Sequence, residues 1–413
     1  MRLSICWTLA FSVAVVATLT TSALGAQASA CNASGAPVLP GVEVLLRDSL
    51  ASLRGQRVGL ITNHSGRDRA GTSTIDLLAR APGVRLAALY GPEHGIRGTA
   101  QAGATIANSV DSATGVPIFS LYGATRVPTA AMLANIDVLI YDIQDVGARF
   151  YTYINTLDHV MEACAANNKE LLILDRPNPN GYVVDGPILE DHLRSGIGMH
   201  RIPIAHGMTI AEFAQLINGE GWLPNKANCK LRIVKVTNYT HATPYTLPVL
   251  PSPNLNTQQS VLLYPSICLF EGTILSQGRG TYIPFTVLGA PALKSQYAFS
   301  FKPVSLKGMS ETPLHQDADC YGLDLRQYDT KKLRKSGQLN LSWLMELYKA
   351  YPEKDRFFDR SYSKQMGDFN KLAGTENLKK QIIAGTPEAN IRKSWEPGLS
   401  NFRKTRKQYL LYP

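Results

Sequence analysis

The chain has 413 residues, of which 45% are apolar, 18% charged and 8% aromatic, a composition that supplies a full globular core and excludes a wholly disordered, collagen-like or low-complexity protein. At about 150 residues per domain, this length predicts two domains or three. The net charge of +10 comes from residues 331–413, which carry 18 Lys and Arg against 8 Asp and Glu, and we interpret this region as a solvated face, with contact to an anionic polymer or lipid as the alternative.

The N-terminal residues have the pattern of an export signal. A positive start and an almost uniformly apolar run as far as Thr21 are followed by small residues. We therefore predict a signal peptide over residues 1–30, cleaved after Ala28 or Ala30, and an exported protein that acts in the periplasm or outside the cell. Cys31, beside the second cleavage position, leaves a lipid anchor open as an alternative. No later run is long and apolar enough for a transmembrane segment, and export makes nucleic acid a poor candidate partner.

Short runs rich in Val, Ile and Leu alternate with helical patterns through the first half of the chain. This alternation is typical of a parallel sheet covered by helices on both faces. The predicted strands are 58–62, 84–90, 137–142 and 170–174, with a further apolar run at 117–122. The predicted helices are 72–80, a helix from Thr129 onward, and 151–167.

Five prolines between residues 244 and 265 interrupt any regular element, which predicts a crossing segment between two domains. The elements predicted after it are a strand at 282–288 and helices at 341–348 and 375–383. We therefore predict an α/β fold with two parts: a Rossmann-like parallel-sheet domain over residues 37–245 and a second, smaller C-terminal α/β domain over residues 246–413 that closes a cleft.

Polar side chains follow each of the predicted strands. In open parallel sheets, ligands bind beyond the carboxyl ends of the strands, because chain reversals and helix N-termini converge there. We therefore take the polar residues at these ends as candidate site residues. They are Asn63, His64, Glu93, His94, Asp142, Gln144, Asp145, Arg176, Asn178 and Asn180.

Two of these strand ends carry several functional groups within a few residues. The glycine-rich loop 91–98 presents Glu93 and Arg97, and the segment 142–149 repeats the pattern with two acids and Arg149. A surface loop can have this composition without any chemistry, but its repetition at another strand end favours a site. Two carboxylates that face each other across a cleft are the minimum for general acid and base catalysis on a glycosidic bond.

The second half of the chain adds another acid and another arginine. Glu271 and Arg279 lie in the glycine-containing segment 270–281, and the amide-rich segment 252–256 precedes it. Amides and arginine suit sugar hydroxyls and a carboxylate, for which the guanidinium offers a two-pronged contact. Glu271 alone is as compatible with a structural partner of a cation as with a catalyst.

Motifs of other enzyme classes are absent from the sequence or incomplete. No phosphate-binding glycine loop, no G-x-S-x-G nucleophile elbow, and no H-E-x-x-H or C-x-x-C metal motif occurs, so we predict neither a nucleotide nor a metal. Ser361 and Lys364 match the S-x-x-K pattern of serine acyl-transfer enzymes, but the partner motifs of that class are missing. The widely spaced cysteines leave disulfides and buried thiols equally open.

Four motifs in order carry a resemblance to a known family. They are Tyr90-Gly-Pro-Glu-His-Gly-Ile-Arg-Gly98, Tyr141-Asp-Ile-Gln-Asp-Val-Gly-Ala-Arg-Phe-Tyr-Thr-Tyr153, Asp175-Arg-Pro-Asn-Pro-Asn-Gly181 and Glu271-Gly-Thr. Together they resemble the exo-acting β-N-acetylmuramidases of the NamZ family. The likeness runs from about residue 41 to the Tyr-Leu-Leu-Tyr-Pro segment at the end of the sequence.

The resemblance implies a reaction and an architecture. It implies release of terminal N-acetylmuramic acid from the non-reducing end of peptidoglycan fragments, in cell-wall turnover and recycling, without a cofactor. It also implies a Rossmann-like catalytic domain, a smaller C-terminal domain and an active cleft between them. The expected partners are muramyl saccharides derived from peptidoglycan. The alternatives are a non-catalytic exported protein or lipoprotein that binds peptidoglycan, and a serine-type amidase or esterase that uses Ser361.

The resemblance also suggests roles for individual residues. Glu93 matches the family's glutamate and is expected to be the catalytic acid, with a pKa raised by burial or by a neighbouring carboxylate. The second group stays open among Asp142, Asp145, Glu271 and the substrate's own acetamido group. N-acetylmuramic acid differs from N-acetylglucosamine by a lactyl ether that bears a carboxylate, so a selective site needs a cation or amide donors there. The arginine candidates are Arg97, Arg149, Arg176 and Arg279, and Tyr151 is a further expected substrate contact.

Overall fold

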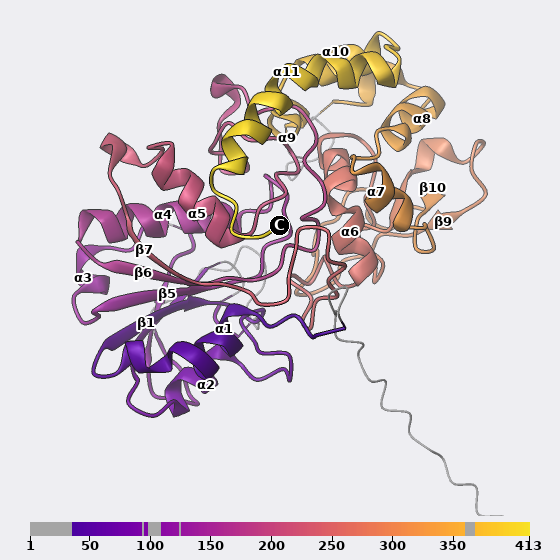
Figure 1. Cartoon of the computed structure of the whole chain (residues 1–413). Helices are drawn as coiled ribbons and strands as arrows, with labels where there is room; N and C mark the ends of the chain where they lie inside the picture. The colour runs from indigo at the N-terminus through magenta and orange to yellow at the C-terminus, as the bar shows by residue number, and fades with distance from the viewer. Residues whose placement is uncertain (1–34, 93–94, 98–108, 124, 360–367) are drawn as a thin grey trace, which may run out of the picture.

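The computed structural model of the chain describes residues 35–92, 95–97, 109–123, 125–359 and 368–413. Its dominant feature is a seven-stranded sheet with helices on both faces, and a three-stranded sheet lies in the second half of the chain (Figure 1). The predicted α/β fold, with a largely parallel sheet and a second, smaller C-terminal part, is therefore confirmed.

The central strands of the large sheet are apolar runs, whereas its two edge strands are partly exposed. Its strands are β1 Arg57–Thr62, β2 Arg85–Gly91, β3 Ser109–Val110, β4 Pro117–Ser120, β5 Val138–Asp142, β6 Glu170–Leu174 and β7 Lys230–Val234. They are ordered β3-β4-β2-β1-β5-β6-β7, and every neighbouring pair is parallel except β3 and β4. All five residues of β5 are buried, as a central strand between two helical layers requires.

Helices cover the two faces of this sheet in separate layers. The helices of the first half are α1 Gly41–Val44, α2 Thr74–Arg80, α3 Ala130–Leu133, α4 Tyr153–Ala166 and α5 Ile210–Gly219. In Figure 1, α1 and α2 lie on one face of the sheet, and α4 and α5 lie on the other. Side chains cap three of these helices. Ser73 accepts a hydrogen bond from the Ile75 amide at the start of α2, Thr129 accepts one from the Met132 amide at the start of α3, and Thr209 and Glu212 form a capping box at the start of α5.

The second half of the chain contributes the small sheet and further helices. The sheet is antiparallel in the order β8-β10-β9, with β8 Val287–Ala290, β9 Ser300–Phe301 and β10 Cys320–Asp324. The helices are α6 Gln258–Ile267, α7 Lys331–Ser336, α8 Ser342–Ala350, α9 Phe369–Ala373, α10 Asn377–Ile383 and α11 Glu388–Lys407. Short π or 3-10 segments across the chain are η1 Leu45–Ser49, η2 Leu50–Leu53, η3 Asp191–Leu193, η4 Pro224–Lys226, η5 Cys268–Gly272, η6 Pro291–Leu293 and η7 Lys354–Arg356.

The proline-rich segment 244–265 is only partly irregular, because α6 begins within it at Gln258. The prediction that prolines exclude any regular element there is therefore wrong for its last part. Pro265 lies inside the helix and has no amide hydrogen, so the Val261 carbonyl loses its usual helical partner. The Asn180 side-chain amide donates to that carbonyl at 3.0 Å and replaces the missing bond.

The predicted strand at 282–288 is displaced along the chain, because β8 begins only at Val287. The residues before it form a turn in which the Phe285 amide donates to the Gln277 carbonyl at 2.7 Å. Phe285 has a φ of 55°, a left-handed conformation that a strand does not contain. Its ring is nevertheless buried, so the apolar residues that suggested a strand fill the core from a turn.

The last residues of the sequence return to the large sheet. The Tyr412 hydroxyl donates to Asp175, which follows β6, at 2.6 Å, and the His241 amide donates to the Pro413 carbonyl at 2.9 Å. One apolar core extends from the α4 and α5 face of the sheet to the helices of the C-terminal part. The two parts of the chain therefore pack against each other around a shared core.

Among the described residues, no helix combines the length and the apolar character needed to cross a membrane. The cysteines in the described part are all buried free thiols: Cys164, Cys229, Cys268 and Cys320. The predicted signal peptide, residues 1–30, and the candidate anchor Cys31 lie outside the described residues, as do Ser361 and Lys364.

Candidate active site

The carboxyl ends of β2, β1 and β5 lie side by side at one edge of the large sheet. Strand β1 pairs in parallel with both neighbours, and Thr62 at its end is the partner of Asp142 at the end of β5. The segments that follow these strands therefore leave the sheet at a common edge, where α/β proteins place their ligands. Glu93 and His94, which follow β2 in the sequence, lie outside the described residues.

A cavity of about 200 Å³ lies where the start of α4 meets segment 252–255, α6, η5 and the turn before β8. Tyr151, Glu271 and Arg279, three of the predicted site residues, line it. It combines aromatic walls with an acid and a cation, a composition typical of small-molecule sites. The full lining is Phe150, Tyr151, Thr152, Tyr153, Ser252, Asn254, Leu255, Tyr264, Glu271, Arg279 and Phe285.

One wall of this cavity is anchored to the edge of the large sheet. The Asn63 side-chain amide donates to the Tyr153 hydroxyl at 2.7 Å, and the Tyr141 hydroxyl of β5 donates to the Tyr153 carbonyl at 2.9 Å. The Tyr151 hydroxyl donates to the Pro251 carbonyl at 3.0 Å. The rings of Tyr151 and Tyr153 meet edge to face, with centroids 5.1 Å apart. These contacts join the strand ends to the cavity.

Glu271 and Arg279 form an ion pair in the cavity. Nε and Nη2 of Arg279 both lie 2.6 Å from Oε1 of Glu271, and the Cys268 thiol donates to Oε2 at 3.5 Å. The guanidinium carbon lies over the Phe285 ring, 5.0 Å from its centroid. Nη1 of Arg279 makes no hydrogen bond within the described part of the chain, and the side chain is 36% exposed. Arg279 can therefore bind a further anion through Nη1.

Asp142 does not line the cavity but forms a buried ion pair with Arg176. Arg176 donates to its two oxygens at 2.5 and 2.9 Å, and the Thr74 hydroxyl donates to Oδ2 at 2.5 Å. Both charged side chains are at most 2% exposed. The geometry gives Asp142 and Arg176 a structural task, because together they tie the ends of β5 and β6 to the start of α2.

Asp145 is buried beside His206 and does not line the cavity. Its Oδ2 accepts the Gly147 amide at 2.7 Å and lies 3.7 Å from Nε2 of His206. Burial raises the pKa of Asp145 to about 7, although the Gly147 amide acts in the opposite direction. Burial, followed by the charges of Arg406 and Arg149, lowers the pKa of His206 to about 3. The histidine is therefore neutral at pH 7, beside a carboxyl that titrates near that pH.

Three predicted amide side chains are buried and donate to backbone carbonyls. They hold the loops that follow the strands in place, and none of them lines the cavity. The contacts are Gln144 to Asp145 and Pro177, both 2.7 Å, Asn178 to Met208, 2.9 Å, and Asn180 to Val146, 2.9 Å, besides the bond to Val261 in α6.

Two of the four candidate arginines have partners away from the cavity. Arg97 lies 2.7 Å from Asp111 and 3.1 Å from Asp76. Arg149 is completely buried, and its guanidinium donates to three backbone carbonyls at 2.6 to 3.0 Å. Arg176, which follows β6, also lies outside the cavity. Arg279 is therefore the only one of the four candidate arginines that lines it.

His64 and several lining residues complete the site region. Nε2 of His64 lies 3.0 Å from the Leu250 carbonyl, which links the end of β1 to the chain before segment 252–255. Tyr153 and Asn254 line the cavity but are not among the site residues predicted from the sequence. Tyr153 ends the motif 141–153, and Asn254 lies in the amide-rich segment 252–256. Tyr264 and Phe285 are apolar core residues by their pattern, and nothing local in the sequence marks them as lining a site.

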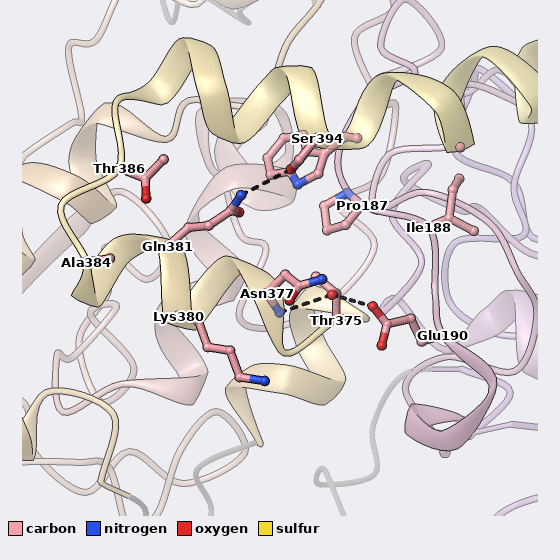
Figure 2. A pocket seen from close by; sticks show the side chains of 12 residues that line it. Pro187, Ile188, Glu190, Thr375, Asn377, Lys380, Gln381, Ala384, Thr386 and Ser394 are labelled. Atoms are coloured by element: carbon pink, nitrogen blue, oxygen red, sulfur yellow. Dashed lines mark hydrogen bonds between the residues drawn. The ribbon is translucent and has the colours of Figure 1, made fainter.

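A larger cavity of about 450 Å³ lies between α10, α11 and the segment 187–190 (Figure 2). Thr375 donates to Glu190 at 2.5 Å, and Gln381 of α10 donates to Ser394 of α11 at 3.2 Å. Figure 2 shows both bonds as dashed lines among the side chains that line the cavity. None of the predicted site residues lines this cavity, so the smaller cavity is the candidate active site.

Comparison with known proteins identifies the family of the chain. Two family models match it: the N-terminal region of the exo-β-N-acetylmuramidase NamZ over residues 58–259, and the C-terminal region over residues 262–412. The chain belongs to the NamZ family. It is 42% identical over 389 residues to the peptidoglycan β-N-acetylmuramidase NamZ of Bacillus subtilis (strain 168), which covers 91% of each chain.

Two solved structures share the NamZ-family fold of this chain. Both are DUF1343 family proteins of Bacteroides fragilis NCTC 9343. The first has a TM-score of 0.82 and 40% identity, and the second a TM-score of 0.77 and 33% identity; each match covers 91% of this chain and 99% of the other. The resemblance stated from the sequence motifs is thus confirmed, and the chain is a member of a family of glycosidases.

In the described part of this NamZ-family chain, no three His, Cys, Asp or Glu side chains are grouped so that they could hold a metal ion. The polar groups of the cavity lining are one acid, one arginine, one amide, and the hydroxyls of tyrosine, serine and threonine side chains. Such a set suits an anionic ligand with many hydroxyl groups.

Proposed function

We propose that this chain hydrolyses the β-glycosidic bond of a terminal N-acetylmuramic acid at the non-reducing end of peptidoglycan fragments, as part of cell-wall turnover and recycling. The name of the Bacillus subtilis relative supports the muramidase activity, and the name of the matched family supports exo action. The observation in this chain that carries the proposal is the position of Arg279 in a cavity with aromatic walls.

Arg279 supplies the selectivity for a muramyl sugar. The lactyl group carries a carboxylate, and a guanidinium forms strong charge-assisted hydrogen bonds with a carboxylate. Glu271 holds Nε and Nη2, so the orientation of the guanidinium is set before substrate binds, and Nη1, which has no partner among the described residues, donates to the lactyl oxygen. N-acetylglucosamine lacks this carboxylate and would leave Arg279 without its ligand.

The catalytic acid in this proposal is Glu93, on the strength of its motif. A general acid protonates the leaving oxygen while positive charge develops on the sugar ring. Asp142 and Asp145 do not line the cavity, so the second group is either Glu271 or the substrate's own acetamido oxygen. In both cases the second group acts on the side of the sugar carbon opposite the leaving oxygen, Glu271 as a carboxylate and the acetamido oxygen as a neutral nucleophile.

The proposed place of action is outside the cytoplasm, in the periplasm or beyond the cell. The apolar run that ends near Thr21 and the small residues after it support export, and peptidoglycan lies outside the membrane. A lipid anchor at Cys31 stays an alternative to a free exported protein.

The test uses two disaccharides that differ in the order of their sugars. N-acetylmuramyl-β-1,4-N-acetylglucosamine should be split into its two sugars, whereas N-acetylglucosaminyl-β-1,4-N-acetylmuramic acid should stay intact. Chromatography of the products measures both reactions. Binding of the first disaccharide without release would instead support the non-catalytic alternative, which the enzymatic name of the relative does not favour. Equal cleavage of both would refute selectivity for a terminal muramyl sugar.

A further inference from the structure

The cavity that contains Arg279 has a volume of only about 200 Å³, so under the proposed function the leaving saccharide needs a binding surface beside it. We propose that an exposed apolar surface formed by Tyr282 and Val304 binds this leaving saccharide, with the tyrosine ring stacked on a face of the first sugar after the scissile bond. The proposal rests on the proposed function and deepens it, because it names where the neutral N-acetylhexosamine part of the substrate is bound.

Tyr282 lies on the turn that contributes two residues to the cavity. Arg279 precedes it by three residues and Phe285 follows it by three, and both line the cavity. Across from this turn, the Asn256 side chain donates to the Tyr282 carbonyl at 3.1 Å, and Asn256 follows the lining residues 254–255 directly. The backbone of Tyr282 is therefore held between two segments of the cavity wall.

The turn is rigid enough to present a ring in a defined place. The Thr281 hydroxyl donates to the Gly278 carbonyl at 2.6 Å, and the Ile283 amide donates back to the Thr281 hydroxyl at 3.1 Å. Ile283 packs on the small apolar cluster beneath the turn, whereas its neighbour Tyr282 is 74% exposed. Because Ile283 is anchored in this cluster, the side chain of Tyr282 lies on the solvent side of the turn.

Val304 is a second exposed apolar residue, and its backbone is bonded to the turn that carries Tyr282. Its amide donates to the Gly280 carbonyl at 2.8 Å, two residues from Tyr282. Large hydrophobic side chains that are exposed in the described part of the chain are few, namely Val110, Tyr282, Val304 and Ile383, and two of these four lie on the hydrogen-bonded segments next to the cavity. Apolar exposure that gathers beside a ligand site is typical of a binding surface.

The segment that carries Val304 is also tied to the cavity. The Asn254 side chain donates to the Met309 carbonyl at 2.9 Å, and Asn254 lines the cavity. A sugar ring presents a flat array of C–H groups on each face, and an exposed aromatic ring removes that array from water without a charged partner. A neutral N-acetylhexosamine fits this surface, whereas the charged lactyl group belongs with Arg279 inside the cavity.

The experiment compares two substrates that share the muramyl sugar and differ in the leaving group. N-acetylmuramyl-β-1,4-N-acetylglucosamine carries the sugar that would stack on Tyr282, and methyl β-N-acetylmuramide carries only a methyl group. Tyr282→Ala should raise KM for the disaccharide by about five- to tenfold and change KM for the methyl glycoside less than about twofold. Val304→Ser should raise KM for the disaccharide by about two- to threefold.

Two further variants separate stacking from other effects. Tyr282→Phe keeps the ring and should leave both KM values near those of the wild type. Ile383→Ala removes a comparably exposed apolar side chain, 52% exposed, from α10, which contributes nothing to the cavity, and should change neither KM value.

The outcomes distinguish this proposal from the function on which it rests. An equal rise in KM for both substrates in Tyr282→Ala, or no rise for the disaccharide, would overturn the subsite while leaving an active muramidase. A rise in Tyr282→Phe as large as in Tyr282→Ala would overturn stacking by the ring. If the wild-type chain releases N-acetylmuramic acid from neither substrate, the proposed function itself fails.

Discussion

Arg279 directs two of its guanidinium nitrogens, Nε and Nη2, to a single oxygen of Glu271, each at 2.6 Å. This arrangement neutralises Glu271 and holds the guanidinium carbon over the Phe285 ring, while no described residue forms a hydrogen bond with Nη1. The arginine is therefore oriented by its own chain for an anion that arrives with the substrate. The pair comes from one short segment, yet the cavity around it is built by residues from across the chain.

The first prediction concerns the lactyl carboxylate. Arg279→Ala should lower kcat/KM on a β-N-acetylmuramide by about ten- to a hundredfold, the effect of one or two charge-assisted hydrogen bonds. The residual rate on the matching β-N-acetylglucosaminide should change much less. Equal loss on both glycosides would show that Arg279 does not recognise the lactyl group.

Arg326 offers a matched control for that variant. It pairs with Asp324 at 2.6 Å and lies over the Phe299 ring at 5.5 Å, so its surroundings resemble those of Arg279, but it does not line the cavity. Arg326→Ala should leave both kcat/KM values unchanged. A comparable loss in this control would point to destabilisation of the C-terminal part.

The second prediction concerns the catalytic acid. Glu93→Gln removes the proton donor and should lower kcat on the muramyl disaccharide by about a hundred- to ten-thousandfold. Binding of free N-acetylmuramic acid, measured by calorimetry, should persist, because the lactyl contact belongs to Arg279. A variant that keeps most of its kcat would exclude Glu93 as the acid.

The third prediction concerns the pH dependence of stability. Burial raises the pKa of Asp145 to about 7 in the folded chain, whereas an unfolded aspartate titrates near 4. Between these values the folded state keeps a proton that the unfolded state releases, so Asp145 makes the free energy of unfolding fall as pH rises. Asp145→Asn removes this contribution. The free energy of unfolding of the variant minus that of the wild type should therefore rise between about pH 4 and pH 7, by at most about 1.4 kcal/mol per pH unit.

Urea unfolding at a series of pH values measures this difference. His206 stays neutral in the folded chain across most of the window, because its pKa is lowered to about 3, and its own linkage is common to both proteins. A difference that does not vary with pH would contradict the raised pKa of Asp145.

The fourth prediction concerns Arg149. Its guanidinium donates to the carbonyls of Pro187 and Ile202, at 3.0 and 2.6 Å, and to that of Leu372, at 3.0 Å, so it joins the loop after β5 to α9. Arg149→Met removes all three buried hydrogen bonds, although the Ile202 carbonyl still accepts from the Leu189 amide at 3.2 Å, and should lower the free energy of unfolding by about 3 to 5 kcal/mol.

The exposed pair of Arg57 and Asp137 provides the comparison. Their side chains are 37% and 42% exposed, so Arg57→Met should lower the free energy of unfolding by about 1 kcal/mol or less. Denaturant unfolding measures both variants. If the two losses were alike, Arg149 would not have the structural task that its burial indicates.

The central strands could be predicted from the sequence because each is buried on both faces, which demands a continuous apolar run such as the one in β5. The edge strand β7 could not be predicted in this way, because Lys230 and Arg232 interrupt its apolar run. Both form ion pairs with Glu170 of β6. The turn before β8 could not be predicted for another reason: its apolar residues enter the core from a left-handed backbone that no local pattern reveals.

The sequence by itself determined the parallel sheet, the family motifs and the set of polar groups at the strand ends, because these follow from apolar periodicity and from short runs of neighbouring residues. Only the tertiary structure decided which of those groups lines the cavity. The sequence does not distinguish the four candidate arginines, but three of them have partners elsewhere. These partners are Asp76 and Asp111 for Arg97, Asp142 for Arg176, and three backbone carbonyls for Arg149. A guanidinium points where its nearest acceptors lie, and those acceptors come from segments far apart in the chain.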